Sequence, residues 1–183
     1  GSGVTYDAAG NLTVDEVGRQ YSYDEQDRLI QIKSVANVVL ATYSLGSCVG
    51  VAIYDPVSRV GGLLHAMLPE SSLDAEKAGR KPAMFVDTGI PALFRAAYEL
   101  RAEKHRVHIY VVGGAQIMDS SGFFNIGRRN CDAVNAIFGR HGLKAVAEEV
   151  GGLVNRTMFL NLATGQLSLK ISGQPEEVIL CGR

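Results

Sequence analysis

Long apolar stretches are missing from this 183-residue sequence. None approaches the roughly 18 residues that a membrane-spanning helix needs. The amino terminus also lacks the charged segment leading into an apolar one that marks an export signal. We therefore predict a cytoplasmic protein with no membrane insertion.

An excess of positive charge is missing as well. The sequence holds 18 Lys and Arg against 19 Asp and Glu, a formal net charge of -1, and no block of basic residues. Proteins that bind nucleic acid carry a basic surface, because phosphate contacts dominate their affinity. The charge pattern argues against a nucleic-acid partner and favours a protein or a small molecule.

Cysteine is scarce and widely spaced. Cys48, Cys131 and Cys181 are an odd number in a chain long enough to bury its own core, which predicts reduced thiols rather than disulfides. Neither the cysteines nor the histidines show paired ligand spacing such as Cys-x-x-Cys, so we predict no metal site. The pair Gly113-Gly114 has no lysine at the spacing of a phosphate-binding loop, so we predict no cofactor and expect tight packing there instead.

Short apolar and β-branched runs predict strands, and two stretches with a period near 3.6 residues predict helices. The expected strands cover 38–43, 49–54, 60–67, 107–112, 144–150, 157–162 and 166–171, and the expected helices cover 83–103 and 130–140. Strands dominate both parts of this pattern with two helices between them, which is typical of an α+β fold. We predict a layered sandwich with two main helices and mostly antiparallel strands.

The first part of the chain contains an internal repetition, in which residues 4–12 are echoed by residues 21–29. This segment resembles one YD (Rhs-type) repeat, where Asp, Asn and Gly form hairpin turns between strands rich in Tyr and Leu. A single hairpin cannot bury its own face, so it must pack on the following domain, belong to a longer array or be mobile. Supplying edge strands to the domain is the plainer alternative. We divide the chain into 1–34, a linker plus this hairpin segment that a fusion would explain, and a main domain over 35–183.

The turn between the second and third expected strands predicts a specific register. Residues 55–58, Asp-Pro-Val-Ser, fit a type I turn with Asp first and Pro second. With these four residues as the loop, Tyr54 pairs with Arg59, and Cys48 lies opposite His65 at about 5 Å between Cβ atoms. A slip of one residue, or a bulge at the glycine pair that follows, would separate the two side chains.

A thiol beside an imidazole allows nucleophilic catalysis. The ring favours the thiolate, so His65 would turn Cys48 into a nucleophile. Thr42 would orient the ring by accepting a hydrogen bond from its other nitrogen. Backbone N–H groups around Gly46 and Ser47 would form an oxyanion hole on the substrate side. The alternative is that the cysteine and the histidine merely fill the core of two buried strands.

The sequence around these residues resembles the chemoreceptor glutamine deamidase (CheD) family of bacterial chemotaxis. Its motifs follow in order from about residue 35 to about residue 171, at 41–49, 54–56, 61–62, 65, 67–69, 85–90, 113–115, 125–130, 148–152 and 156. The resemblance implies an α/β/α-type layered fold, and it assigns the catalytic cysteine, histidine and threonine to Cys48, His65 and Thr42.

The same resemblance implies a cysteine-dependent protein-glutamine deamidase that converts selected glutamines of chemoreceptor cytoplasmic helices to glutamate. It also implies a CheC-type phosphatase as a binding partner. Two alternatives stay open. The YD-like segment suggests a deamidase toxin effector, since such repeats often precede toxic domains, and the fold alone would suit an inactive CheD-like binding module.

Overall fold

The computed structural model describes residues 5–6, 12–14, 38–117, 125–175 and 177–181. The strands are β1 (Thr5–Tyr6), β2 (Leu12–Val14), β3 (Val39–Leu45), β4 (Val49–Asp55), β5 (Val60–Ala66), β6 (His108–Gly113), β7 (Ala147–Val150), β8 (Arg156–Asn161), β9 (Leu167–Ile171) and β10 (Val178–Cys181). The helices are α1 (Ala75–Arg80), α2 (Val86–Glu99) and α3 (Ile126–His141), with 3-10 turns at Ser71–Leu73 and Pro82–Met84.

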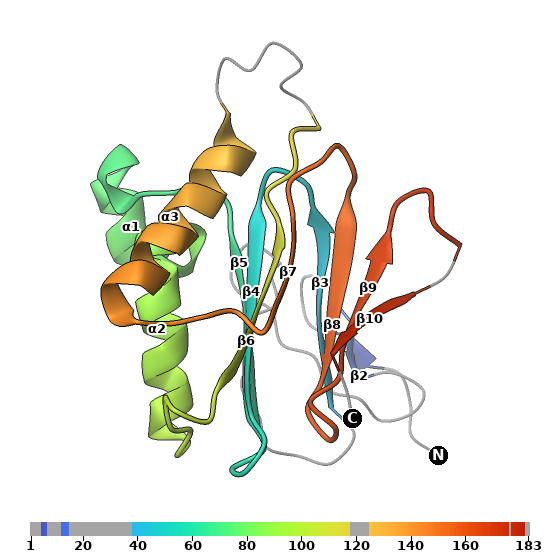
Figure 1. The fold of residues 1–183 in the computed structure, drawn as a ribbon. Coiled ribbons are helices and arrows are strands. Elements are labelled where there is room, and N and C mark those ends of the chain that lie inside the picture. Colours follow the sequence, from blue (N-terminus) through green and yellow to red (C-terminus); the bar gives the residue numbers. More distant parts are fainter. Residues whose placement is uncertain (1–4, 7–11, 15–37, 118–124, 176, 182–183) are drawn as a thin grey trace.

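Two four-stranded sheets form the main domain, and the three helices lie on one side of them (Figure 1). The first sheet has the order β5-β4-β6-β7 and the second the order β10-β9-β8-β3. All pairs within these sheets are antiparallel except β6 and β7, which are parallel and joined through α3. The predicted α+β class, the two main helices and the mostly antiparallel pairing are confirmed.

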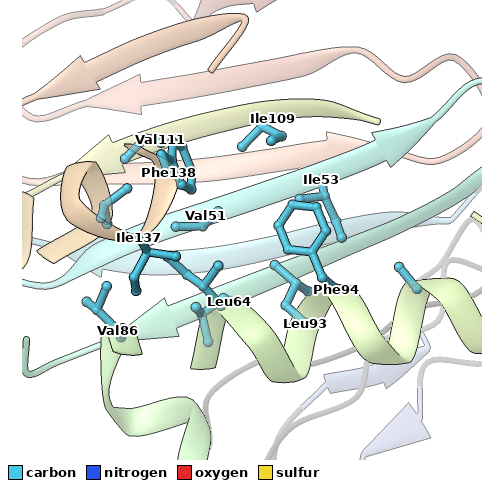
Figure 2. Packing of buried hydrophobic residues seen from close by; sticks show 14 of the residues in the cluster. Val51, Ile53, Leu64, Val86, Leu93, Phe94, Ile109, Val111, Ile137 and Phe138 are labelled. Atoms are coloured by element: carbon cyan, nitrogen blue, oxygen red, sulfur yellow. The ribbon is translucent and has the colours of Figure 1, made fainter. Parts of the chain in front are cut away.

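The first sheet is buried on both faces, which explains why β4 is buried along its whole length and apolar up to Asp55 at its end. Its residues Val51 and Ile53 face the helices, where Leu93 and Phe94 of α2 pack against them (Figure 2). The alternate residues, such as Tyr54, face the second sheet and belong to a separate core. One strand therefore contributes to two cores, and the helices and the second sheet each cover one face of it.

The layer order corrects the α/β/α arrangement that the resemblance implied. The described layers run helices, first sheet, second sheet, because β3, β8, β9 and β10 cover the face where a second helical layer was expected (Figure 1). Burial alternates along β8 and β9, with buried residues such as Met158 and Leu169 directed at the core between the sheets. An antiparallel sheet is stable with one face on the core and the other in solvent. The outer face of this sheet therefore needs no covering helices.

Several element boundaries differ from the predicted ones. The helix α3 begins at Ile126, four residues before the expected start, and ends at His141, one residue after the expected end. Gly142 caps it with a φ of 60°, the left-handed conformation that glycine favours. The predicted helix 83–103 is shorter, because a 3-10 turn precedes α2 and the helix ends at Glu99.

In the described part of the chain, no helix has the length and apolar character needed to span a membrane.

Only a small part of the amino-terminal segment is described. There β1 and β2 pair antiparallel, with Thr5 opposite Val14, as expected for the first hairpin of the repeat-like segment. Residues 15–37, which include the second Tyr-Asp unit, lie outside the described residues. The division of the chain at residue 34 therefore stays a prediction.

The β4–β5 hairpin corrects the predicted register. Asp55 does occupy the first turn position, since its Oδ1 accepts hydrogen bonds from the amides of Val57 at 2.9 Å and Ser58 at 3.3 Å. Arg59 adopts a left-handed φ of 54° and belongs to the loop, so strand pairing starts between Asp55 and Val60. The loop thus lies one residue later than predicted. As a result, each residue of β5 pairs with a residue of β4 two positions later than predicted.

Asp55 is a fully buried carboxylate that ties this hairpin to the segment after α2. It accepts hydrogen bonds from Arg106 Nη2 at 2.8 Å, from Arg106 Nε at 3.1 Å and from the Glu103 amide at 3.0 Å. Burial alone would raise the pKa of Asp55, but the hydrogen bonds from Arg106 and from the backbone amides outweigh it and hold the pKa well below its usual value. The charged form of Asp55 therefore stabilises the fold.

We expect Asp55→Asn to lower the free energy of unfolding by about 3 kcal/mol at neutral pH, because an amide cannot satisfy all these donors and Arg106 loses its counter-ion. The folded-state pKa lies below that of the unfolded chain, so the stabilisation is present above about pH 4 and is lost as the pH falls further. Urea unfolding measures this effect at the two pH values. The difference in free energy of unfolding between native protein and Asp55→Asn should be smaller below about pH 4 than at neutral pH. The exposed Asp132 provides the control, since Asp132→Asn should change stability by less than about 0.5 kcal/mol. Equal stability of Asp55→Asn and native protein at neutral pH would contradict this role.

Candidate active site

Thr42 and His65 meet in the space between the two sheets. Thr42 lies on β3 in the second sheet and His65 on β5 in the first, and Thr42 Oγ1 is 2.7 Å from His65 Nδ1. Thr42 is buried and His65 is half-buried. The contact predicted from the sequence between these residues is confirmed, and it fixes the ring at Nδ1 across the sandwich.

Cys48 lies at the end of the bend that joins β3 to β4, one residue before β4 begins. Gly50 is the residue paired with His65, so the predicted pairing of Cys48 directly with His65 is wrong by two positions. A shift of two keeps side chains on the same face of a sheet. Consistent with this, Cys48 is half-buried and packs against the core between the sheets, the core that β3 and β5 also face.

Three successive carbonyl groups of the bend are hydrogen-bonded into the protein. The Gly46 carbonyl accepts from the Ala115 amide at 2.7 Å, the Ser47 carbonyl from Asn130 Nδ2 at 2.9 Å, and the Cys48 carbonyl from the Gly114 amide at 2.8 Å. These contacts come from the segment after β6 and from α3. They hold the backbone on both sides of the thiol in one conformation.

Two glycines at the end of β6 allow this close approach. Gly113 and Gly114 have φ of 108° and 63°, which other residues adopt only with strain. A Cβ on Gly113 would lie 2.4 Å from the Cys48 carbonyl oxygen, and one on Gly114 would lie 2.2 Å from Cys131 Sγ. The predicted tight packing at this pair is confirmed.

Gly46 contributes through its small size rather than through its amide. Its N–H donates to the Ser44 carbonyl at 2.9 Å, so it is already used within the bend. A Cβ at Gly46 would lie 3.0 Å from Asn155 Oδ1 and 3.2 Å from Ile117 Cδ1. These two exposed side chains therefore flank the bend and form part of its rim.

Arg156 holds one side of this rim and was not singled out from the sequence as a site residue. It is buried, and it donates to the carbonyls of Gly151 at 2.8 Å and Val154 at 3.2 Å and to Glu149 Oε1 at 2.9 Å. It thereby fixes the loop that carries Asn155. A charged residue directly before the predicted strand 157–162, at one of the positions that carry the family resemblance, was the available signal.

Asn130 was also missed as a functional residue. It is fully buried on α3, and its Nδ2 donates to the carbonyls of both Ser47 and Met67. A polar residue on the helix face that also carries Val134 and Ile137 was the signal, because that spacing places all three on the core side.

The second described cysteine differs from Cys48. Burial raises the pKa of the Cys131 thiol, and the negative charges of Asp132 and Glu148 raise it further. A thiol of this kind stays protonated and is a poor nucleophile. Within the described ranges, no group of three His, Cys, Asp or Glu side chains is arranged to hold a metal ion.

Cys48, His65 and Thr42 bring a half-buried thiol, an imidazole and a hydroxyl to the core between the two sheets. Comparison with known proteins gives the family. The family described as CheD chemotactic sensory transduction matches residues 67–171, which begin two residues after His65. An RHS Repeat matches residues 6–39.

Individual relatives extend this similarity. The "Probable chemoreceptor glutamine deamidase CheD 1" of Syntrophus aciditrophicus is 49% identical over 137 residues, which cover 75% of this chain and 86% of the relative. The corresponding CheD protein of Solibacter usitatus is 42% identical over 141 residues, 77% of this chain and 83% of its own. The CheD protein of Pyrococcus horikoshii is 40% identical over 136 residues, which cover 73% of this chain and 83% of the relative. The chain belongs to the CheD family, which confirms the resemblance found in the sequence.

Proposed function

We propose that the domain over residues 35–183 is a cysteine-dependent protein-glutamine deamidase that acts on chemoreceptors in the cytoplasm. The single observation that carries the proposal is the 2.7 Å contact between Thr42 and His65 beside the bend that holds Cys48. The names of the relatives, which are chemoreceptor glutamine deamidases, support the reaction and the substrate. Cys48, His65 and Thr42 are the proposed catalytic residues.

The first half-reaction replaces the amide nitrogen by sulfur. The Cys48 thiolate attacks the carbon of the glutamine carboxamide, and the C–S bond forms as the carbonyl oxygen takes the negative charge. Protonated His65 then donates its proton to the nitrogen, the C–N bond breaks, and ammonia leaves. A thioester of the glutamine side chain on Cys48 remains.

The second half-reaction releases glutamate. Neutral His65 accepts a proton from water, and the resulting hydroxide attacks the thioester carbon. The C–S bond breaks, and the sulfur leaves as the thiolate that starts the next cycle. Thr42 keeps the ring oriented by its bond to Nδ1 throughout, so that Nε2 exchanges the protons. A hydroxyl stabilises a charged ring less than the carboxylate of other triads does.

The oxyanion of both half-reactions needs hydrogen-bond donors. We assign this role to the amides of Ser47 and Cys48, which lie nearest to the sulfur along the chain, whereas the amide of Gly46 donates to Ser44. Gly46 serves the substrate side, because the absence of a side chain there leaves the bend open between Asn155 and Ile117.

Incubation of the protein with the cytoplasmic part of a chemoreceptor tests the function. Hydrolysis of an amide to an acid should raise the mass of particular glutamine-containing peptides by about 1 Da. Peptide mass spectrometry after proteolysis identifies the positions. Receptor masses that stay unchanged, with folded enzyme present, would contradict the proposal.

A CheC-type phosphatase is the proposed binding partner, on the strength of family membership. The two purified proteins should co-elute from a sizing column. Separate elution at micromolar concentrations would count against this partner and leave the deamidase proposal intact.

A toxin effector is the second candidate function, and the match of residues 6–39 to an RHS Repeat favours it. In this case the same thiol chemistry would act on a protein of another cell. Expression of the main domain should then arrest growth of a bacterium that lacks chemoreceptors, whereas a chemotaxis enzyme should leave growth unchanged.

A further inference from the structure

Asn130 links the two chain segments that carry the proposed nucleophile and the proposed base. Its Nδ2 donates to the Ser47 carbonyl at 2.9 Å and to the Met67 carbonyl at 3.0 Å. Ser47 directly precedes Cys48, and Met67 follows His65 by two residues. One amide group thus fixes the distance between the bend and the end of β5.

The bond to Ser47 also orients a particular peptide group. The Ser47 carbonyl and the Cys48 N–H belong to one planar peptide, in which the two groups point in opposite directions. Because Asn130 draws the carbonyl toward α3, the Cys48 N–H is directed away from α3. This N–H is one of the two donors assigned above to the oxyanion.

The buried position of Asn130 includes a cost to the stability of the fold. The side chain is fully buried, and its Oδ1 has no hydrogen-bond partner among the described residues. A buried polar atom of this kind costs roughly 1–3 kcal/mol, and native structures hold few of them without a reason. An apolar side chain on α3 would avoid that cost but would remove the hydrogen bonds from Asn130 to these two carbonyls.

We propose that Asn130 is a positioning residue for the oxyanion hole: its amide sets the plane of the Ser47–Cys48 peptide and holds that peptide in register with the His65 strand. The proposal rests on the deamidase function proposed above. Asn130 does not touch the substrate in this account, and it acts through the backbone of the bend. It should therefore affect the step in which negative charge develops on oxygen and leave the ionisation of the thiol unchanged.

Two reactions of Cys48 separate these effects. Deamidation passes through an oxyanion, whereas alkylation by iodoacetamide displaces iodide from a saturated carbon and places no charge on a carbonyl oxygen. Asn130→Ala and Asn130→Asp should each lower kcat for deamidation by about 10²-fold with little change in KM, as loss of an oxyanion donor does. The rate and pH profile of Cys48 alkylation should stay within about twofold of native for Asn130→Ala, which adds no charge.

The exposed Asn135 on the same helix provides the matched control. Asn135→Ala and Asn135→Asp should leave both reactions at native rates. Circular dichroism and thermal unfolding of each variant show whether it is folded.

The outcomes are distinct. Full deamidation by folded Asn130 variants, or equal losses in deamidation and alkylation, would overturn this inference alone, provided that native protein is active. Failure of both Asn130 variants to fold would restrict the residue to the fold and overturn it as well. No deamidation by the native protein would remove the proposed function, and this inference with it.

Discussion

Cys48→Ala should lose receptor deamidation by roughly 10⁴-fold or more, the largest effect that we expect of any single substitution. Without the sulfur no thioester forms, and the remaining groups of the site can only assist a direct attack by water. Peptide mass spectrometry of the receptor at several times gives the rate at each modified glutamine. The variant should fold normally, since the side chain is half-buried at the end of a bend.

Cys131→Ala is the matched control for this loss. Burial raises the pKa of Cys131, so its thiol is not expected to react, and deamidation should stay within about threefold of native. A Cys48→Ala protein that keeps every measurable effect of the native protein would contradict the mechanism. It would instead support the alternative of an inactive CheD-like binding module.

His65→Gln should lower the deamidation rate by roughly 10³-fold or more, the second largest expected effect. Glutamine keeps a polar side chain of similar length but cannot exchange protons with the thiol, the leaving nitrogen and the water. The loss should appear in kcat, because the imidazole acts in the chemical steps rather than in receptor binding. Rates measured over a range of receptor concentrations separate kcat from KM.

Thr42→Val provides a graded comparison for this prediction. Valine keeps the shape of threonine and removes only the hydroxyl at 2.7 Å from His65 Nδ1. The loss should be smaller, about 10-fold to 100-fold, because the ring keeps its proton chemistry and loses only its fixed orientation. A larger loss in Thr42→Val than in His65→Gln would contradict the assigned roles.

The sequence predicted most of the individual helices and strands, and the family motifs predicted one contact between distant residues. Strand runs and the apolar period of α2 placed most elements, and motif order linked Thr42 to His65 although they lie 23 positions apart in the chain. The layer order was not predictable in the same way, since a strand buried on both faces such as β4 has the same apolar pattern under helices as under a sheet.

The predicted register of the β4–β5 hairpin was wrong for a specific reason. Arg59 adopts a left-handed φ of 54°, a conformation that usually selects glycine, asparagine or aspartate. Arginine gave no sign of it, so the loop was predicted one residue too early. Asn130 was missed because it binds the backbone carbonyls of Ser47 and Met67, and every residue has such a carbonyl whatever its type. Its partners could therefore not be identified from the sequence.

The account depends on a thiol that an adjacent imidazole keeps ionised near neutral pH. The pH dependence of iodoacetamide alkylation in the folded protein, resolved by peptide mass spectrometry, measures this at Cys48 with Cys131 as an internal reference. We predict that alkylation of Cys48 in the native protein stays fast down to about pH 6.5, and that His65→Gln moves its pH profile into the alkaline range of an ordinary thiol. A Cys48 that reacts only in the alkaline range of an ordinary thiol, in native protein and in His65→Gln alike, would contradict the account.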